Sequence, residues 1–460
     1  MLEPAYQADV VIVGAGVAGL SAAHRLTSAG VTTAVLEAAP YAGGRMSTEK
    51  IDGFRLDRIG QLLSTAYPEL RLTPGLDALP LLPFTPGVLL HSDGRRHRAG
   101  VLTGPPGARR ARGALHAVRA LASAPRSASP RGVPSQTSLP RVRASAPLGT
   151  AVDQARLGAA LARLASAPVE RQLARPELPA AQALAERGIP TRTIDGFLRP
   201  LLAMLLCDPE LTTSSRCADL ALRAFAGGRL CVPEGGAEAL PELLARALPP
   251  GTVHTGVRVT SISTTSVTTA EHGEIRCRAV LLATDARTAA ELLPGLRVPD
   301  FHPVTVVHHT ADEPPTTGAS LLLDADRGGP VAHTTVISQV DPSRAPAGRP
   351  LISSTVLGTP PPDIDTAVRM HLSRLYGTST TRWETLAVHH TPEAVPTMRP
   401  PHDLRRPVRL LAGLYVCGDH RDTSTLQGAL HSAHRAASAI LTDLGAAGSL
   451  HRAEPLRAAA

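Results

Sequence analysis

Three glycines near the start of the chain are spaced for phosphate binding. The run Gly14-Ala15-Gly16-Val17-Ala18-Gly19 has the pattern G-x-G-x-x-G and follows an apolar, β-branched stretch. In such a turn the first glycine permits a tight bend, the second lets the backbone approach a pyrophosphate, and the third lets helix and strand pack closely. The phosphates bind at the helix N-terminus, where free N–H groups and the helix dipole favour negative charge. The pattern therefore predicts a dinucleotide site.

An acidic residue at the end of the next apolar strand fits the same site. Residues 33–36 are apolar or β-branched, and Glu37 follows them, 18 residues after Gly19. A carboxylate at this place accepts hydrogen bonds from the hydroxyls of an adenosine ribose and repels a 2′-phosphate, which disfavours NADP. We include the neighbouring Ala38 in the predicted contact. A solvated acid at a strand end is the simpler alternative.

The pair Gly43-Gly44 precedes Arg45, so a flexible loop brings a cation towards the phosphates. With this segment the chain resembles the superfamily of flavin amine oxidases, phytoene desaturases and protoporphyrinogen oxidases. The stretch around Gly196-Phe197 further resembles the phytoene desaturase-like branch. The resemblance implies FAD as the cofactor and extends from Val10 to Ile440. The FAD contacts it implies, besides those above and Gly44 and Arg45, are Gly60, Gln61, Val259, Ala283, Thr284, Gly418, Asp419, Gln427, Gly428 and Ala429.

The elements that must position these residues alternate between strand and helix patterns. Residues 9–13 and 33–36 predict parallel strands on either side of a helix over residues 17–29. We expect an α/β fold: a three-layer Rossmann-like FAD-binding domain with an inserted α+β substrate domain that holds an antiparallel sheet and helices. The expected FAD-binding segments are 1–65, 226–295 and 401–445, the substrate segments are 66–225 and 296–400, and 446–460 form a tail.

Charge and composition restrict the partners. The net charge is +8, and Lys50 is the only lysine, so the other 46 basic residues are arginines. Eleven arginines and no acidic residue fall between residues 94 and 152. This stretch predicts a loop-rich insertion with short helices. It would suit an anionic membrane surface, although a solvated loop in an arginine-rich chain explains it more simply. Because the arginines lack interleaved aromatic residues, we do not expect nucleic-acid binding.

Cellular location follows from three further observations. The five cysteines form no Cys-x-x-Cys pair, the N-terminus has no basic region typical of a signal peptide, and no apolar run reaches transmembrane length. We expect a cytoplasmic protein, with peripheral contact to a membrane as the alternative. The oligomeric state stays open.

Hydride transfer to flavin is the expected chemistry. In the amine oxidase branch a lysine holds a water at the flavin, but Lys50 lies in the cofactor-binding part, and Thr425 stands where that branch has a cage tyrosine. These departures favour dehydrogenation or desaturation of a mostly apolar small molecule. Three alternatives remain: amine oxidation, a non-redox FAD enzyme such as a sugar mutase, and an FAD-free carrier of the same fold. We assign no catalytic base. The candidate polar groups near the flavin are His420, Arg421, Asp422, His389 and His390.

Overall fold

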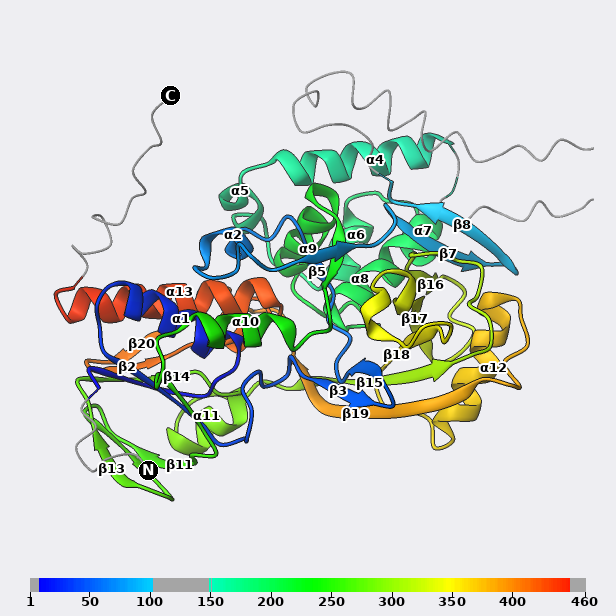
Figure 1. Cartoon of the computed structure of the whole chain (residues 1–460). Helices are drawn as coiled ribbons and strands as arrows, with labels where there is room; N and C mark the ends of the chain where they lie inside the picture. The colour runs from blue at the N-terminus through cyan, green and yellow to red at the C-terminus, as the bar shows by residue number, and fades with distance from the viewer. Residues whose placement is uncertain (1–7, 102–148, 150, 447–460) are drawn as a thin grey trace, which may run out of the picture.

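A computed structural model describes residues 8–101, 149 and 151–446. Its first sheet has six strands in the order β10-β2-β1-β14-β21-β20. Strands β2, β14 and β20 of this sheet are labelled in Figure 1. The first five run parallel, and β20 pairs antiparallel at the edge. Almost every residue of the central strands is buried, which explains why they are continuous apolar runs. The strands are β1 (Val10–Val13), β2 (Thr33–Glu37), β10 (Val253–Thr255), β14 (Ala279–Leu282), β20 (Arg409–Leu411) and β21 (Leu414–Val416).

Two layers cover this sheet. One face packs against helices α1 (Val17–Ser28), α10 (Ala239–Ala247) and α13 (Leu426–Asp443). The other face packs against a small antiparallel sheet and the helix that follows it. The three-layer Rossmann-like arrangement is thus as expected, with strands in the third layer. These last elements are β11 (Val259–Ile262), β12 (Ser266–Thr269), β13 (Gly273–Arg276) and α11 (Ala286–Leu292).

A second large sheet has seven strands in the order β19-β15-β18-β17-β16-β7-β8. Its pairs are antiparallel except β16 with β7, which run parallel. The antiparallel sheet expected for the inserted region is therefore present, with one parallel pair. The strands are β7 (Val88–Ser92), β8 (Arg95–Ala99), β15 (Phe301–Thr310), β16 (Leu322–Asp324), β17 (Val331–Val336), β18 (Leu351–Leu357) and β19 (Glu384–Pro396).

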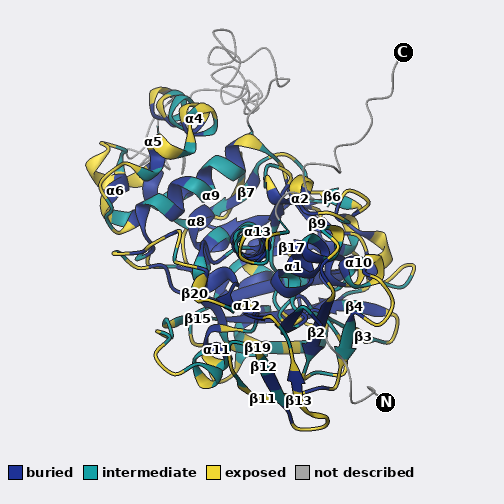
Figure 2. Cartoon of the chain, turned by 90° about the vertical axis from the view of Figure 1, so that its left-hand side faces the viewer, coloured by how far each residue is buried: buried dark blue, intermediate teal, exposed yellow. Residues whose placement is uncertain are grey.

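Helices cover both faces of the second sheet. Helix α12 (Ile364–Tyr376) packs on one face. The other face contributes to a core with α4 (Ala151–Ser166), α6 (Ala180–Glu186), α8 (Arg199–Leu206) and α9 (Ser215–Gly227). Figure 2 shows buried residues concentrated in the sheets and in α1 and α13, whereas α4 to α6 (α5, Val169–Leu173) carry more exposed residues. Each large sheet therefore packs against hydrophobic clusters on both of its faces.

Short strands lie between the two large sheets. The hairpin β3 (Thr48–Ile51) and β4 (Phe54–Asp57) packs in the hydrophobic cluster of the second sheet through Phe54 and Leu56. Strand β9 (Leu230–Pro233) pairs with β5 (Leu63–Ser64) and β6 (Leu81–Pro83). Asp57 at the end of β4 accepts hydrogen bonds from the amide of Ala237, at 2.8 Å, and the hydroxyl of Thr48, at 2.7 Å. The guanidinium of Arg344, 1% exposed, lies 3.1 Å from the other oxygen of this carboxylate. This buried ion pair fixes the chain just before Gly60.

The basic stretch from 94 to 152 is described only at its ends. Residues 95–99 form strand β8 rather than the expected loop, and Ala151–Ser166 form helix α4. Residues 102–148 and 150 lie outside the described residues, so the expected loop and its membrane contact stay predictions. Within the described part of the chain, no helix is long and apolar enough to cross a membrane.

Candidate cofactor and substrate site

The three glycines of the first turn meet different surroundings. Gly14 has φ +105°, and a side chain there would approach the carbonyl oxygen of Ala283 to 2.9 Å. An added Cβ on Gly19 would lie 2.0 Å from the carbonyl oxygen of Gly14. A Cβ on Gly16 would meet nothing within 4 Å. Two of the glycines are therefore required by packing, and the third leaves open space at the start of α1.

That open space lies at a helix end suited to a phosphate. Gly16 is the N-cap of α1, and no side chain caps this end of the helix. The amides of the first turn are thus free of a side-chain acceptor, and the helix dipole places partial positive charge there. The turn has the geometry that a pyrophosphate requires.

Glu37 is held in place by its own backbone neighbours. One carboxylate oxygen accepts a hydrogen bond from the amide of Ala15 at 2.8 Å, and the other accepts one from the amide of Ala39 at 2.9 Å. The carboxylate is therefore fixed at the end of β2, next to the glycine turn. Each oxygen retains a free lone pair for a ribose hydroxyl.

Arg45 connects three segments that are distant in sequence. Its guanidinium donates to Asp419 at 2.6 Å and to the carbonyl oxygen of Ala394 at 2.8 Å. Gly44, just before it, has φ +57°, which a residue with a side chain rarely adopts. The arginine therefore joins the Gly-Gly loop to β19 and to the turn after β21.

We predict that Arg45→Lys lowers the affinity for FAD roughly tenfold or more, because a lysine cannot make both contacts of the planar guanidinium and each charged hydrogen bond contributes about 1.5–3 kcal/mol. Fluorescence titration of apoprotein with FAD measures this. Arg58→Lys is the matched control, since Arg58 pairs with Glu49 at 3.1 Å and its side chain is 49% exposed. Equal FAD affinity in the two variants would contradict the assigned role of Arg45.

These residues line one cavity of about 760 Å³. It extends from the first sheet to strands β15, β17 and β18 of the second sheet, which contribute Val304, His333 and Thr355 to its lining. Sixteen of the residues predicted to contact the cofactor line it: Gly14, Gly16, Val17, Ala18, Glu37, Ala38, Gly44, Arg45, Gly60, Gln61, Val259, Ala283, Thr284, Gly418, Asp419 and Ala429.

Four other predicted contacts are not among the lining residues. Ala15 and Gly19 lie within the turn itself, where they hold Glu37 and the packing of α1. The side-chain oxygen of Gln427 accepts from the amide of Glu69 at 3.0 Å, so that side chain is engaged with α2 (Glu69–Leu72). A Cβ on Gly428 would lie 1.9 Å from the carbonyl oxygen of Thr423, so this glycine is required by loop packing.

The start of α13 faces the cavity through other residues. Thr425 is its N-cap, and its hydroxyl accepts from the amide of Gly428 at 3.3 Å. Thr425, Leu426 and Ala429 line the cavity. The helix N-terminus is therefore directed at the cavity, where it can stabilise the negative charge that a reduced flavin carries.

The candidate polar groups after Gly418 do not line the cavity. His420 is 5% exposed, and burial lowers its pKa to about 4. Asp422 accepts from His431 at 2.9 Å and pairs with Arg435 at 3.3 Å. Burial, together with Arg406 and Arg435, lowers the pKa of Arg421 to about 10. All three are bound into the loop that carries Asp419.

The two histidines of β19 are also absent from the lining. His390 shares a hydrogen bond with the hydroxyl of Thr305 at 2.8 Å. The ring of His389 packs edge-on against His308, with 5.6 Å between ring centroids. Neither histidine is placed to contact a substrate in the cavity.

Sequence reasoning missed a second set of lining residues, which we call the apolar half of the cavity. Apolar side chains dominate it, and Tyr67, Cys207, His333, Thr355 and Ser424 supply its polar atoms. The apolar members are Ile59, Leu62, Met204, Leu205, Leu206 and Val304. A histidine within a predicted strand, such as His333 in VAHTTV, was the available signal.

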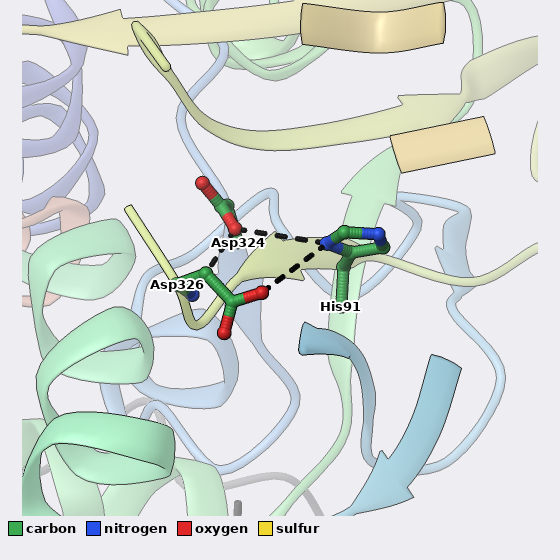
Figure 3. A group of neighbouring side chains, drawn as sticks. All are labelled: His91, Asp324 and Asp326. Atoms are coloured by element: carbon green, nitrogen blue, oxygen red, sulfur yellow. Dashed lines mark hydrogen bonds and ion pairs between the residues drawn. The ribbon is translucent and has the colours of Figure 1, made fainter. Parts of the chain in front are cut away.

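A cluster of metal-ligand type lies outside this cavity. Figure 3 shows His91, Asp324 and Asp326, whose ligand atoms lie within 4.8 Å of one another. The carboxylates already have partners: Asp324 pairs with His371 at 3.1 Å, and Asp326 accepts from Ser92 at 2.8 Å. We therefore interpret this cluster as a structural link between β7 and the end of β16.

Together, the fold and the cavity define a dinucleotide-binding flavoprotein. The open space over Gly16, the uncapped N-terminus of α1 and the carboxylate at the end of β2 suit the pyrophosphate and adenosine of FAD. Residues 17–441 match the family described as flavin containing amine oxidoreductase. The chain belongs to this family, and FAD is its cofactor.

Individual relatives match over short stretches. Putrescine oxidase of Kocuria rosea is 43% identical over 98 residues, which span 21% of this chain and 20% of that protein. Carotenoid 3,4-desaturase of Haloarcula japonica is 49% identical over 49 residues, which span 11% of this chain and 10% of that protein. The match thus covers about a fifth of the putrescine oxidase and a tenth of the desaturase.

Solved structures agree with the fold over nearly the whole chain. An oxidoreductase from Methanosarcina mazei superposes with a TM-score of 0.66 at 16% identity, covering 94% of this chain and 99% of the other. Reduced UDP-galactopyranose mutase gives 0.64 at 14% identity, covering 96% and 98%. At these identities the likeness establishes the fold alone.

Proposed function

We propose that the protein is an FAD-dependent oxidoreductase that dehydrogenates or desaturates a mostly apolar small molecule. The observation that carries this proposal is the composition of the cavity. Among the residues that the structure describes, the acidic lining residues are Glu37, Asp285 and Asp419. All three lie at or just after the ends of strands of the first sheet, where the cofactor is expected. The half that would hold the substrate is apolar with neutral polar groups.

The residues of this chain would orient a substrate and exclude water. Bound FAD supplies the hydride acceptor, the flavin N5. The apolar side chains of α8 and β15 contact the hydrocarbon part of the substrate and displace water from the reacting carbon. The N-terminus of α13 would stabilise negative charge on a cofactor held in the cavity.

Amine oxidation is disfavoured by the position of the only lysine. Lys50 lies on β3, its side chain is 56% exposed, and it pairs with Glu238 at 2.8 Å. It is not among the residues that line the cavity. No lysine can therefore hold a water beside the flavin.

We expect anaerobic bleaching of the flavin absorbance by neutral apolar compounds with a removable hydride, and no bleaching by small diamines. The flavin of the Lys50→Gln variant should be bleached at the same rate as that of the unaltered protein. A surface ion pair contributes only about 0–1 kcal/mol to stability, and this pair lies outside the cavity. Rapid bleaching by diamines, or its loss in Lys50→Gln, would favour amine oxidation. If the flavin is not reduced by any compound of a broad panel, the mutase-like alternative gains support.

A further inference from the structure

We propose that His333, with Thr355 beside it, binds a neutral hydroxyl or carbonyl group of the substrate. The inference rests on the proposed function and narrows its substrate class to uncharged, mostly apolar molecules with one polar group. His333 lies on β17, is 6% exposed and lines the same cavity as the glycine turn. It is thus a polar group in the apolar half of the site.

A β-bulge directs His333 into the cavity. Along β17, Val331 pairs with Val356, but the next pair is His333 with Thr355, so Ala332 is an extra residue. Val331 packs in the core on the α12 face. Two residues later a regular strand would direct His333 to that same face, but the extra residue reverses its direction. Without the bulge, Ala332 would stand opposite Thr355.

One ring nitrogen of His333 lacks a partner in the described part of the chain. Its buried Nδ1 has no hydrogen-bond partner there. A buried polar atom without a partner costs free energy, so such an atom on a residue that lines a cavity indicates a ligand. Burial lowers the pKa of His333 to about 4, which makes the ring neutral at pH 7. A neutral ring has one donor and one acceptor, and a hydroxyl can bind either.

The surroundings argue against a cationic ligand. Among the described residues, the acidic members of the lining lie at the ends of strands of the first sheet and not beside His333, so an ammonium near His333 would find no carboxylate. Thr355 lies between Val306 on β15 and His333 on β17, and it adds a neutral hydroxyl to the same row. An uncharged polar group matches this pair better than a charged one.

Calorimetric titration of the FAD-loaded protein with 1-octanol and octylammonium tests the proposal, since the two probes differ only in the head group. We expect 1-octanol to bind more tightly. We expect His333→Leu to weaken 1-octanol binding roughly five- to tenfold, the value of one hydrogen bond, and His333→Asn to retain most of it. His272→Leu, an exposed histidine in the turn between β12 and β13, should leave binding unchanged.

Two results would overturn the proposal. One is tighter binding of octylammonium than of 1-octanol by the unaltered protein, which requires no variant to fold. The other is unchanged 1-octanol affinity in a His333→Leu protein whose flavin spectrum is normal. Failure of the proposed oxidoreductase function would instead appear as an absence of flavin bleaching by any substrate, which calorimetry does not measure.

Discussion

Replacing Gly16 by alanine is expected to weaken FAD binding roughly ten- to hundredfold while leaving the apoprotein folded. The added methyl group would meet no protein atom within 4 Å, so it enters only the space assigned to the pyrophosphate. Overpacking of this kind costs about 1–3 kcal/mol, and this free energy corresponds to FAD binding that is roughly ten- to hundredfold weaker. Fluorescence titration with FAD measures it, and thermal unfolding of the apoprotein checks the fold.

Gly19→Ala is the matched variant, and it is expected to change the stability of the apoprotein rather than only its affinity for FAD. Its methyl group would lie 2.0 Å from the carbonyl oxygen of Gly14, so strand and helix must separate. We expect the apoprotein itself to unfold at a lower temperature. If Gly16→Ala binds FAD normally, the cofactor does not pass over the start of α1.

Replacing Arg344 by methionine is expected to destabilise the protein by about 3–5 kcal/mol, the usual cost of leaving one partner of a buried ion pair alone. Arg344 is 1% exposed and lies 3.1 Å from Asp57. It also donates to the carbonyl oxygen of Arg55 at 2.8 Å. Because Asp57 holds the chain just before Gly60, FAD release on heating should occur at a lower temperature as well.

Arg382→Met is the control for this prediction. Arg382 pairs with Asp312 at 3.3 Å, but the two side chains are 85% and 65% exposed. Solvent and salt screen such a pair, so we expect a change below about 1 kcal/mol. Equal unfolding midpoints for the two variants would show that the Asp57–Arg344 pair does not stabilise the fold.

The interior strands could be predicted from the sequence, whereas the edges of the second sheet could not. Buried strands such as β1 and β2 are largely apolar runs, and their bounds agree with prediction within a residue. The edge strand β8 begins Arg95-Arg96-His97-Arg98, and the other edge, β19, contains Pro392. Charged residues and proline are typical of edge strands and remove the apolar alternation that identifies a strand.

The two halves of the site also differ in how far the sequence predicts them. The glycine turn is a short local motif whose function follows from backbone conformation, so its residues could be found without a structure. The substrate half combines α8, β17 and β18, which only the sheet order brings together. Periodicity alone would direct His333 to the α12 face, and the bulge at Ala332 reverses this.

The visible absorption spectrum of the purified protein, followed by heat release of its chromophore, tests the central claim most directly. We predict flavin absorption bands in the folded protein and FAD in the supernatant after heating. A folded protein that is colourless and does not take up added FAD would contradict the account and would favour an FAD-free carrier of the same fold.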